Sequence, residues 1–184
     1  RGFDADDRGG GIACFDAGHW TNQLVDCAVR GNSAGDGGGI FVAPAAICHL
    51  SATGTNAFDV RGNSATNFGG GVCTSTQAVF RASGRMRFAA NRAAYGGGLA
   101  ARAGSVAAIE EAGGEVPAIY GNTATNSGGG LFAAENSTLL ALRDVQIGSG
   151  GDAIQGNAAN GDASFSGGGG IALGNPISAS GNRP

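Results

Sequence analysis

A short string of residues recurs along this chain and constrains its fold more than any other feature. In the copy that runs from Phe88 to Leu99, it consists of an apolar residue, two spacers, an asparagine, a spacer, an alanine, a short link, three glycines and a branched aliphatic residue. Four further copies span 29–40, 60–72, 119–131 and 154–171, with partial copies at 9–12 and at Asn182. Repetition at a period of about 20–50 residues is typical of solenoids and other repeat architectures.

Each full repeat contains three short segments with strand-like composition. In one repeat they are Ile40–Val42 after the glycines, Ala46–Leu50 in the middle, and Phe58–Val60 before the asparagine. Glycine triplets are costly inside helices, and no apolar stripe with helical spacing connects them. The sequence therefore predicts an all-β fold, a right-handed parallel β-helix of about five to six coils with three short strands each. We expect one such domain over 1–184, whose N-terminal residues 1–8 form an acidic segment.

This fold assigns a position to each repeated residue, because coils stacked about 4.8 Å apart place like residues in columns. One inward column is predicted from the aliphatic residue after the glycines: Ile12, Ile40, Val72, Leu99, Leu131 and Ile171. A second is predicted from the residue three before the asparagine: Val29, Val60, Phe88, Ile119 and Ile154. Glycines suit the corners between sheets. The asparagines tolerate left-handed backbone and can form a hydrogen-bonded ladder from coil to coil: Asn32, Asn63, Asn91, Asn122, Asn157 and Asn182.

Composition and charge exclude several classes of function. The eleven cationic residues and fourteen acidic residues are dispersed along the chain, so no basic stripe suggests nucleic-acid binding. No run of 18 apolar residues exists that could cross a membrane. The chain starts at Arg1, and its repeats begin and end within a unit, so we expect it to be a piece of a longer protein.

The string Phe88-x-x-Asn91 followed by Gly96-Gly97-Gly98-Leu99 resembles the polymorphic outer membrane protein repeat of chlamydial surface proteins. That family carries Phe-x-x-Asn and Gly-Gly-Ala-Ile/Leu signatures, and the resemblance extends in register from Gly9 to Asn182. The chain departs from the family at the third small residue, which is glycine here, and where Val or Ile replaces Phe. The resemblance implies a pectin-lyase-like β-helix in a surface or autotransporter passenger protein, located outside the cell or at the outer membrane and used for adhesion or display.

Two short segments are candidate calcium ligands, since calcium prefers several oxygen ligands. Asp4, Asp6 and Asp7 cluster before the first coil, and Asp152 follows a glycine-rich stretch that looks like one degenerate calcium nonapeptide. Solvated loops are the favoured alternative for both, because single copies and adjacent acids do not complete a coordination shell. No other cofactor is expected.

His19 and Trp20 are a candidate carbohydrate contact, because an exposed aromatic ring beside a polar group suits the face of a sugar. Packing of Trp20 over a coil end or loop is the commoner arrangement. Neither His19 nor His49, the second histidine, can be assembled with other residues into a catalytic triad without assuming a geometry.

Four cysteines lie in the first three predicted coils: Cys14, Cys27, Cys48 and Cys73. Cys14 and Cys73 follow glycine triplets two coils apart, which is too far for a disulfide. Cys14–Cys27 and Cys48–Cys73 are the pairings that the predicted geometry leaves open, and buried thiols are the alternative.

The second residue of the strand after the glycines is expected to point outward, yet no charge occurs in that column. It contains Phe41 and Phe132 among small residues. Such a face is covered either by a loop or by another protein, and Phe41 and Phe132 are therefore the candidate partner face.

Taken together, these patterns predict a non-catalytic structural or adhesive β-solenoid of an extracellular or cell-surface protein, a rigid stalk or interaction surface for a protein or glycan. One alternative is a carbohydrate-active lyase or hydrolase, which would need Asp, Glu and Arg residues stacked on neighbouring coils of one face. Another is a structural subunit that self-associates into a larger extracellular fibre or complex.

Overall fold

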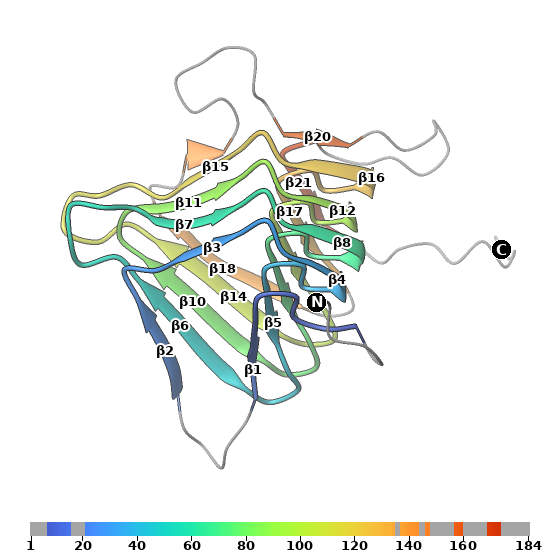
Figure 1. Ribbon diagram of the computed structural model, residues 1–184, viewed down its shortest axis with the longest axis horizontal. Helices are drawn as coiled ribbons and strands as arrows, with labels where there is room; N and C mark the ends of the chain where they lie inside the picture. Colours follow the sequence, from blue (N-terminus) through green and yellow to red (C-terminus); the bar gives the residue numbers. More distant parts are fainter. Residues whose placement is uncertain are drawn as a thin grey trace, which may run out of the picture.

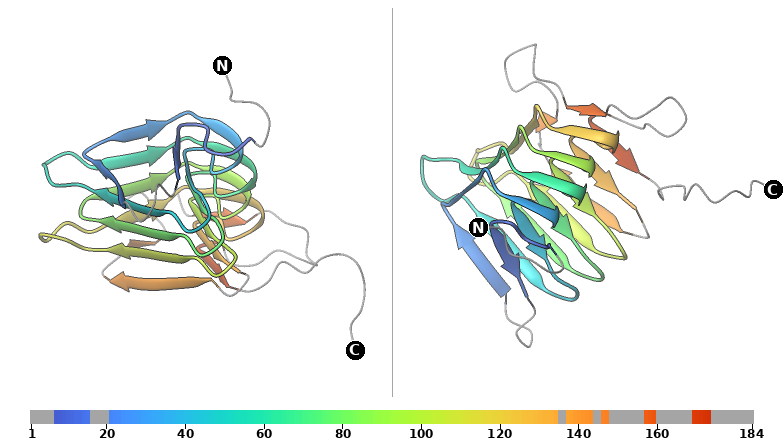
Figure 2. Two further views of the ribbon diagram at one scale, coloured as in Figure 1. Left: turned by 90° about the horizontal axis from the view of Figure 1, so that it is seen from below. Right: turned by 45° about the vertical axis from the view of Figure 1, so that its right-hand side comes forward.

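The computed structural model describes residues 7–15, 21–134, 137–143, 146–147, 157–159 and 169–173. These residues form an all-β parallel solenoid of about four turns (Figure 1). The strands of successive coils lie side by side in chain order, from blue to orange along the stack (Figure 2). In the described part of the chain, no helix has the length and apolar character needed to cross a bilayer.

Each coil contributes one strand to each of four parallel sheets, which we number in chain order. Sheet 1 contains β1 (Ile12–Cys14), β5 (Ile40–Val42), β9 (Val72–Thr74), β13 (Leu99–Ala101), β17 (Leu131–Ala133) and β21 (Ile171–Leu173). Sheet 2 contains β2 (Thr21–Val25), β6 (Ile47–Ser51), β10 (Val79–Ser83), β14 (Val106–Glu110) and β18 (Thr138–Arg143). Sheet 3 contains β3 (Ala28–Arg30), β7 (Phe58–Arg61), β11 (Met86–Ala89), β15 (Ala118–Tyr120) and β19 (Gln146–Ile147). Sheet 4 contains β4 (Ser33–Asp36), β8 (Ser64–Phe68), β12 (Arg92–Tyr95), β16 (Thr123–Ser127) and β20 (Ala158–Ala159).

The prediction of five to six coils with three strands each is wrong in both numbers. The prediction counted one coil for every glycine triplet, including the partial copies. It also missed sheet 4, whose strands follow the asparagines and are short, small and polar, as in Ser33–Asp36. We refer below to β1–β4 as the first coil and to β5–β8 as the second.

The first predicted column is confirmed. Residue-to-residue pairing in sheet 1 joins Ile12, Ile40, Val72, Leu99, Leu131 and Ile171 in order. The second column is confirmed from Val29 through Val60 and Phe88 to Ile119. Its next member is Ile147 rather than Ile154, which lies outside the described residues. The 40-residue spacing of the last two triplets therefore contains extra chain after the column residue.

The buried asparagines form the predicted ladder from Asn32 to Asn157, and Asn182 lies outside the described residues. At Asn91, the side-chain amide donates to the carbonyl of Val60 in the preceding coil at 2.9 Å and to Oδ1 of Asn122 in the next coil at 3.0 Å. Its Oδ1 accepts hydrogen bonds from the backbone and side-chain nitrogens of Asn63 at 3.0 and 3.1 Å. Asn91 is 1% exposed, and Asn63, Asn91 and Asn122 each tie three successive coils together.

From Asn32 to Asn122, the residue with left-handed backbone is the one before the ladder asparagine, not the asparagine itself. Gly31, Gly62 and Gly121 have φ angles of 61° to 67°, and Ala90 holds the equivalent place with a φ of 53°. The predicted left-handed role of the asparagines is therefore corrected, and their hydrogen bonds are what the fold uses.

The third glycine of each triplet lies against the ladder. A Cβ atom built on Gly39 would be 2.6 Å from the carbonyl oxygen of Gly71 and 2.9 Å from Nδ2 of Asn63. Both distances are shorter than real Cβ contacts, so the corner accepts only glycine unless the coils move apart.

We expect Asn91→Ala to lower the free energy of unfolding by about 2–4 kcal/mol, because it leaves buried donors and acceptors of both neighbouring coils unpaired. Urea denaturation followed by circular dichroism measures the change. The control is Asn56→Ala, at an exposed asparagine outside the ladder. Equal stability of the two variants would contradict the assigned role of the ladder.

We expect Gly71→Ala to destabilise the solenoid by about 3 kcal/mol or more, since its Cβ would overlap the carbonyl of Gly98 and approach Nδ2 of Asn91 at 3.0 Å. Gly54→Ala is the control, because its Cβ would meet nothing closer than Asp26 Oδ2 at 3.7 Å. Thermal unfolding of both variants tests this, and a Gly71→Ala midpoint equal to that of Gly54→Ala would refute the steric argument.

Candidate functional site

The outer face of sheet 2 carries a column of polar residues along the solenoid. Its strands alternate, so that Cys48 and Leu50 of β6 point inward while His49 and Ser51 lie on the outer face. The pairing register aligns Gln23, His49, Arg81 and Ala108 on successive coils. A second outer column aligns Val25, Ser51, Ser83 and Glu110. The two columns place amide, imidazole, guanidinium, hydroxyl and carboxylate groups next to one another.

These columns line a hollow of about 270 Å³ on the face of the sheet. The main polar side chains around it are Gln23, His49, Arg81 and Glu110. Within the described part of the chain, none of these four side chains forms a hydrogen bond or ion pair. Their polar atoms are therefore available to a ligand in the hollow.

The pKa of His49 is lowered from its ordinary value of about 6.5, first by partial burial and second by the positive charge of Arg81. His49 is therefore neutral at pH 7, with one ring nitrogen able to donate and the other able to accept. The adjacent Arg81 supplies donors only, and Glu110 supplies acceptors only. The face thus offers both hydrogen-bond donors and hydrogen-bond acceptors within one hollow.

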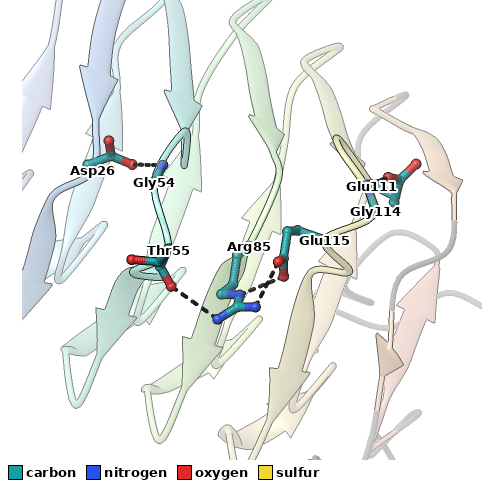
Figure 3. A network of polar contacts seen from close by, with 7 residues as sticks. All are labelled: Asp26, Gly54, Thr55, Arg85, Glu111, Gly114 and Glu115. Atoms are coloured by element: carbon teal, nitrogen blue, oxygen red, sulfur yellow. Dashed lines mark hydrogen bonds and ion pairs between the residues drawn. The ribbon is translucent and has the colours of Figure 1, made fainter.

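Several charged residues outside this face are paired with the protein itself (Figure 3). Arg85 holds Glu115 through two contacts, Nε to Oε2 at 2.6 Å and Nη2 to Oε1 at 2.7 Å, and its Nη1 donates to the carbonyl of Thr55. Asp26 accepts hydrogen bonds from Thr53 and Gly54 of the next coil. The hydrogen bond from Arg85 lowers the pKa of Glu115, and that from the Thr53 side chain lowers the pKa of Asp26. These contacts join the loops between sheets 2 and 3 of neighbouring coils.

A second hollow of about 270 Å³ lies on the outer face of sheet 3, beside Asp59, Arg30 and Arg87. Arg30 Nη2 lies 2.6 Å from Asp59 Oδ2, and the Asp59 side chain is 4% exposed whereas that of Arg30 is 61% exposed. Asp59 Oδ1 is buried and has no hydrogen-bond partner. The Asp59 carboxylate in this hollow is therefore engaged by Arg30, whereas no such partner among the described residues holds Glu110 in the hollow of sheet 2.

The uncharged column that contains Phe41 and Phe132 is covered by the chain's own side chains. Both phenylalanines are 3% exposed. The Phe132 ring packs against Tyr95 at 5.2 Å and against Phe68 at 6.2 Å between centroids. The Arg8 guanidinium carbon lies 5.5 Å from the centre of the Phe41 ring. Both rings are therefore covered by side chains of this chain, and a partner at this face stays a prediction.

The four cysteines are all thiols in this structure. The sulfur atoms of Cys14 and Cys48 lie 2.8 Å apart in the interior, a pairing that the sequence analysis did not consider. Cys27, by contrast, is exposed, and its Sγ contacts the carbonyl oxygen of Val25 at 3.0 Å. The two pairings expected from the sequence, Cys14–Cys27 and Cys48–Cys73, are not the pairing that the fold brings together.

Most of the other candidate ligands lie outside the described residues. This is the case for Asp4, Asp6, His19, Trp20 and Asp152. Asp7 is described, and its backbone carbonyl accepts hydrogen bonds from Gly35 and Asp36 of the first coil. Among the described residues, no group of three or more His, Cys, Asp or Glu side chains could hold a metal ion. Calcium binding and carbohydrate binding by these residues stay predictions.

The sheet 2 site was missed by sequence reasoning although a signal for it existed. His49 follows Ile40 by nine residues, and Arg81 follows Val72 by the same number. Glu110 follows Leu99 by eleven residues, as Ser51 follows Ile40. Counting from the residue after the glycines would therefore have aligned this face from the second coil onward. The first coil breaks the rule because Gln23 follows Ile12 by eleven residues rather than nine.

We expect the pKa of His49 to lie below 6.5 and to rise in Arg81→Ala, without returning fully, because burial is the larger cause of the shift. Titration of the His49 ring resonances by NMR measures this, with His49→Gln to assign the signal and Arg87→Ala as the control. Since the unfolded chain then binds the proton more tightly, His49 also makes the fold lose stability as the pH falls below about 6.5. An unchanged His49 pKa in Arg81→Ala would contradict the electrostatic contact.

Comparison with known protein families, with curated protein sequences and with solved structures finds no match to this chain. The functional argument therefore rests on the solenoid and on the outer face of sheet 2.

Proposed function

We propose that this chain is a non-catalytic β-solenoid of an extracellular or cell-surface protein, and that the outer face of sheet 2 is its interaction surface for a glycan. The observation that carries the proposal is the group of side chains without bonds to the protein, Gln23, His49, Arg81 and Glu110, around one hollow of about 270 Å³. Elsewhere in the described part, such groups as Arg85 and Glu115 are engaged with each other.

The chemistry of this face suits a polyhydroxylated ligand. Each sugar hydroxyl both donates and accepts hydrogen bonds, and the hollow presents donors on Arg81, acceptors on Glu110 and both on neutral His49. Beside it runs a half-buried aliphatic column, Ile47, Val79 and Val106, against which the C–H face of a sugar ring can pack. The mixed charge of the face favours a neutral glycan over a highly anionic one.

The direction of the columns favours an extended polymer over a small molecule. Equivalent outer positions recur on adjacent parallel strands, at about 4.8 Å per coil. A glycan chain that lies along the solenoid axis therefore meets Gln23, His49 and Arg81 in turn. This arrangement is that of an adhesive surface on a rigid rod.

The location and the finer family assignment are part of the same proposal. The repeat from Phe88 to Leu99 resembles the polymorphic outer membrane protein repeat, which supports a passenger or stalk region at a cell surface. We also infer that the coil is right-handed, as parallel strands with crossover connections in one sheet nearly always are. The departure from that repeat, glycine for its third small residue, fits the close contact between Gly39 and the ladder.

A carbohydrate-active enzyme is the second candidate, favoured by one observation. His49, Arg81 and Glu110 come from three successive coils of one face, which is the stacking that such an enzyme requires. Glycoside hydrolysis by the usual route needs two carboxyl groups about 5–10 Å apart. Among the described residues of this face, Glu110 is the single carboxylate, and we therefore place binding before catalysis.

A glycan array with the purified chain tests the proposal. We expect binding to a neutral or weakly charged polysaccharide. The double variant His49→Ala/Arg81→Ala should lose at least tenfold in apparent affinity, because it removes the hydrogen-bond donors of both side chains. Arg61→Ala, at an exposed arginine of sheet 3, is the matched control and should bind as the wild type does.

Two outcomes would count against the binding surface: no glycan bound by the wild-type chain, or equal binding by the double variant. The bound glycan should also be examined by mass spectrometry after incubation. Shortened products that disappear in His49→Ala would replace the binding proposal with the enzyme candidate.

A further inference from the structure

We propose that Cys14 and Cys48 are oxidised to a disulfide that ties the first coil of the solenoid to the second. The proposal rests on the interior geometry of these coils and does not depend on the glycan surface. It assigns a pairing that differs from both pairings the sequence had left open.

The two cysteines approach each other across the interior of the solenoid. Cys14 ends β1 and is paired in sheet 1 with Val42 of the second coil. Cys48 lies in β6 of sheet 2 and is paired there with Asn22 of the first coil. Both side chains point inward, with exposures of 2% and 0%, and their sulfur atoms are 2.8 Å apart. Formation of a disulfide, with an S–S bond of about 2.05 Å, shortens this separation by less than about 1 Å.

A polar side chain, Asn22, lies in the interior of the first coil at this point. The inward column of sheet 2 reads Asn22, Cys48, Phe80 and Ala107 from coil to coil. Asn22 replaces the expected apolar side chain, and its amide donates to the carbonyls of Phe15 and Ile47 at 3.1 Å. A covalent link between coils at this level would supply the cohesion that apolar contacts provide deeper in the stack.

The contact also prepares the two thiols for different steps of the oxidation. The hydrogen bond with Cys48 lowers the pKa of the Cys14 thiol, against the opposing effect of burial. The same hydrogen bond, together with burial, raises the pKa of the Cys48 thiol. Cys14 is therefore the thiol that ionises first and acts as the nucleophile.

The oxidant is a disulfide, either a small molecule or a thiol–disulfide exchange protein. The Cys14 thiolate attacks one of its sulfurs, forms a mixed disulfide and releases one thiol. Cys48 then loses its proton to solvent and attacks the Cys14 sulfur, which releases the second thiol. Two protein thiols are oxidised and one disulfide is reduced to two thiols. Because both cysteines are buried, the exchange requires a local opening that admits the oxidant to Cys14 while Cys48 stays in contact with it.

Alkylation after refolding with oxidised glutathione tests the pairing directly. The wild-type chain is denatured without reductant, treated with N-ethylmaleimide and weighed by mass spectrometry. We expect two cysteines, Cys27 and Cys73, to react, and all four to react after reduction. If all four react without reduction, the proposal is overturned.

Peptide mapping identifies which cysteines are joined. Trypsin leaves Cys14 and Cys27 together in the peptide 9–30, with Cys48 in 31–61 and Cys73 in 62–81. The variant Cys27→Ser resolves the ambiguity, since a 9–30/31–61 link in this variant must contain Cys14. Recovery of that link supports the proposal. A 31–61/62–81 link, or loss of all links in Cys27→Ser, overturns it.

Thermal unfolding with and without dithiothreitol supplies the functional readout. We expect the reductant to lower the melting temperature of the wild type and of Cys27→Ser by roughly 5–15 °C. The melting temperature of Cys48→Ser should be the same with and without dithiothreitol, whatever its value, because this variant has no Cys14–Cys48 disulfide to reduce. An equal response of Cys48→Ser and Cys27→Ser to the reductant would count against the disulfide.

Discussion

Hydrogen bonding of buried asparagine side chains fixes how the coils of this solenoid stack. An amide buried without partners costs free energy, so these side chains accept only arrangements in which all their groups are satisfied. Asn91 meets that condition because the alignment of the neighbouring coils places Asn63, Val60 and Asn122 within hydrogen-bonding distance of its side chain. A slip of one residue in any coil would break these bonds and would also reverse the inward and outward faces of the strands. The ladder and the apolar columns thus enforce the same alignment.

The ladder in turn explains the glycine corners. The third glycine of each triplet faces the ladder asparagine and the glycine carbonyl of the following coil, where a methyl group has no room. The residue before the asparagine needs a positive φ, which glycine provides at Gly31, Gly62 and Gly121 while Ala90 adopts it without that advantage. The repeated string is therefore one structural unit, in which the asparagine determines which neighbours must be small.

The parts of the fold that repeat in sequence could be predicted, and the parts that vary could not. The strands after the glycines and the columns of Val72 and Phe88 were predicted correctly because apolar residues recur at them at a fixed place in the repeat. Sheet 4 escaped prediction because its strands consist mostly of small and polar residues, as in Ser33–Asp36, so their propensity gives little sign of a strand. The polar face of sheet 2 and the Cys14–Cys48 contact escaped for a related reason, since both join residues whose types do not repeat between coils.

This division between repeated and varied positions shows where a solenoid can carry function. Interior residues contact the coils on both sides, so a substitution at Asn91 or Phe88 alters contacts in three coils at once. Outer residues of sheet 2 lie outside the stacked core, and the column Gln23, His49, Arg81 and Ala108 accordingly changes its chemistry at every coil without disturbing the backbone. A sheet face of this kind can acquire binding groups one coil at a time. Its chemical variety within a repetitive scaffold is therefore a stronger indication of an interaction surface than any single residue in it.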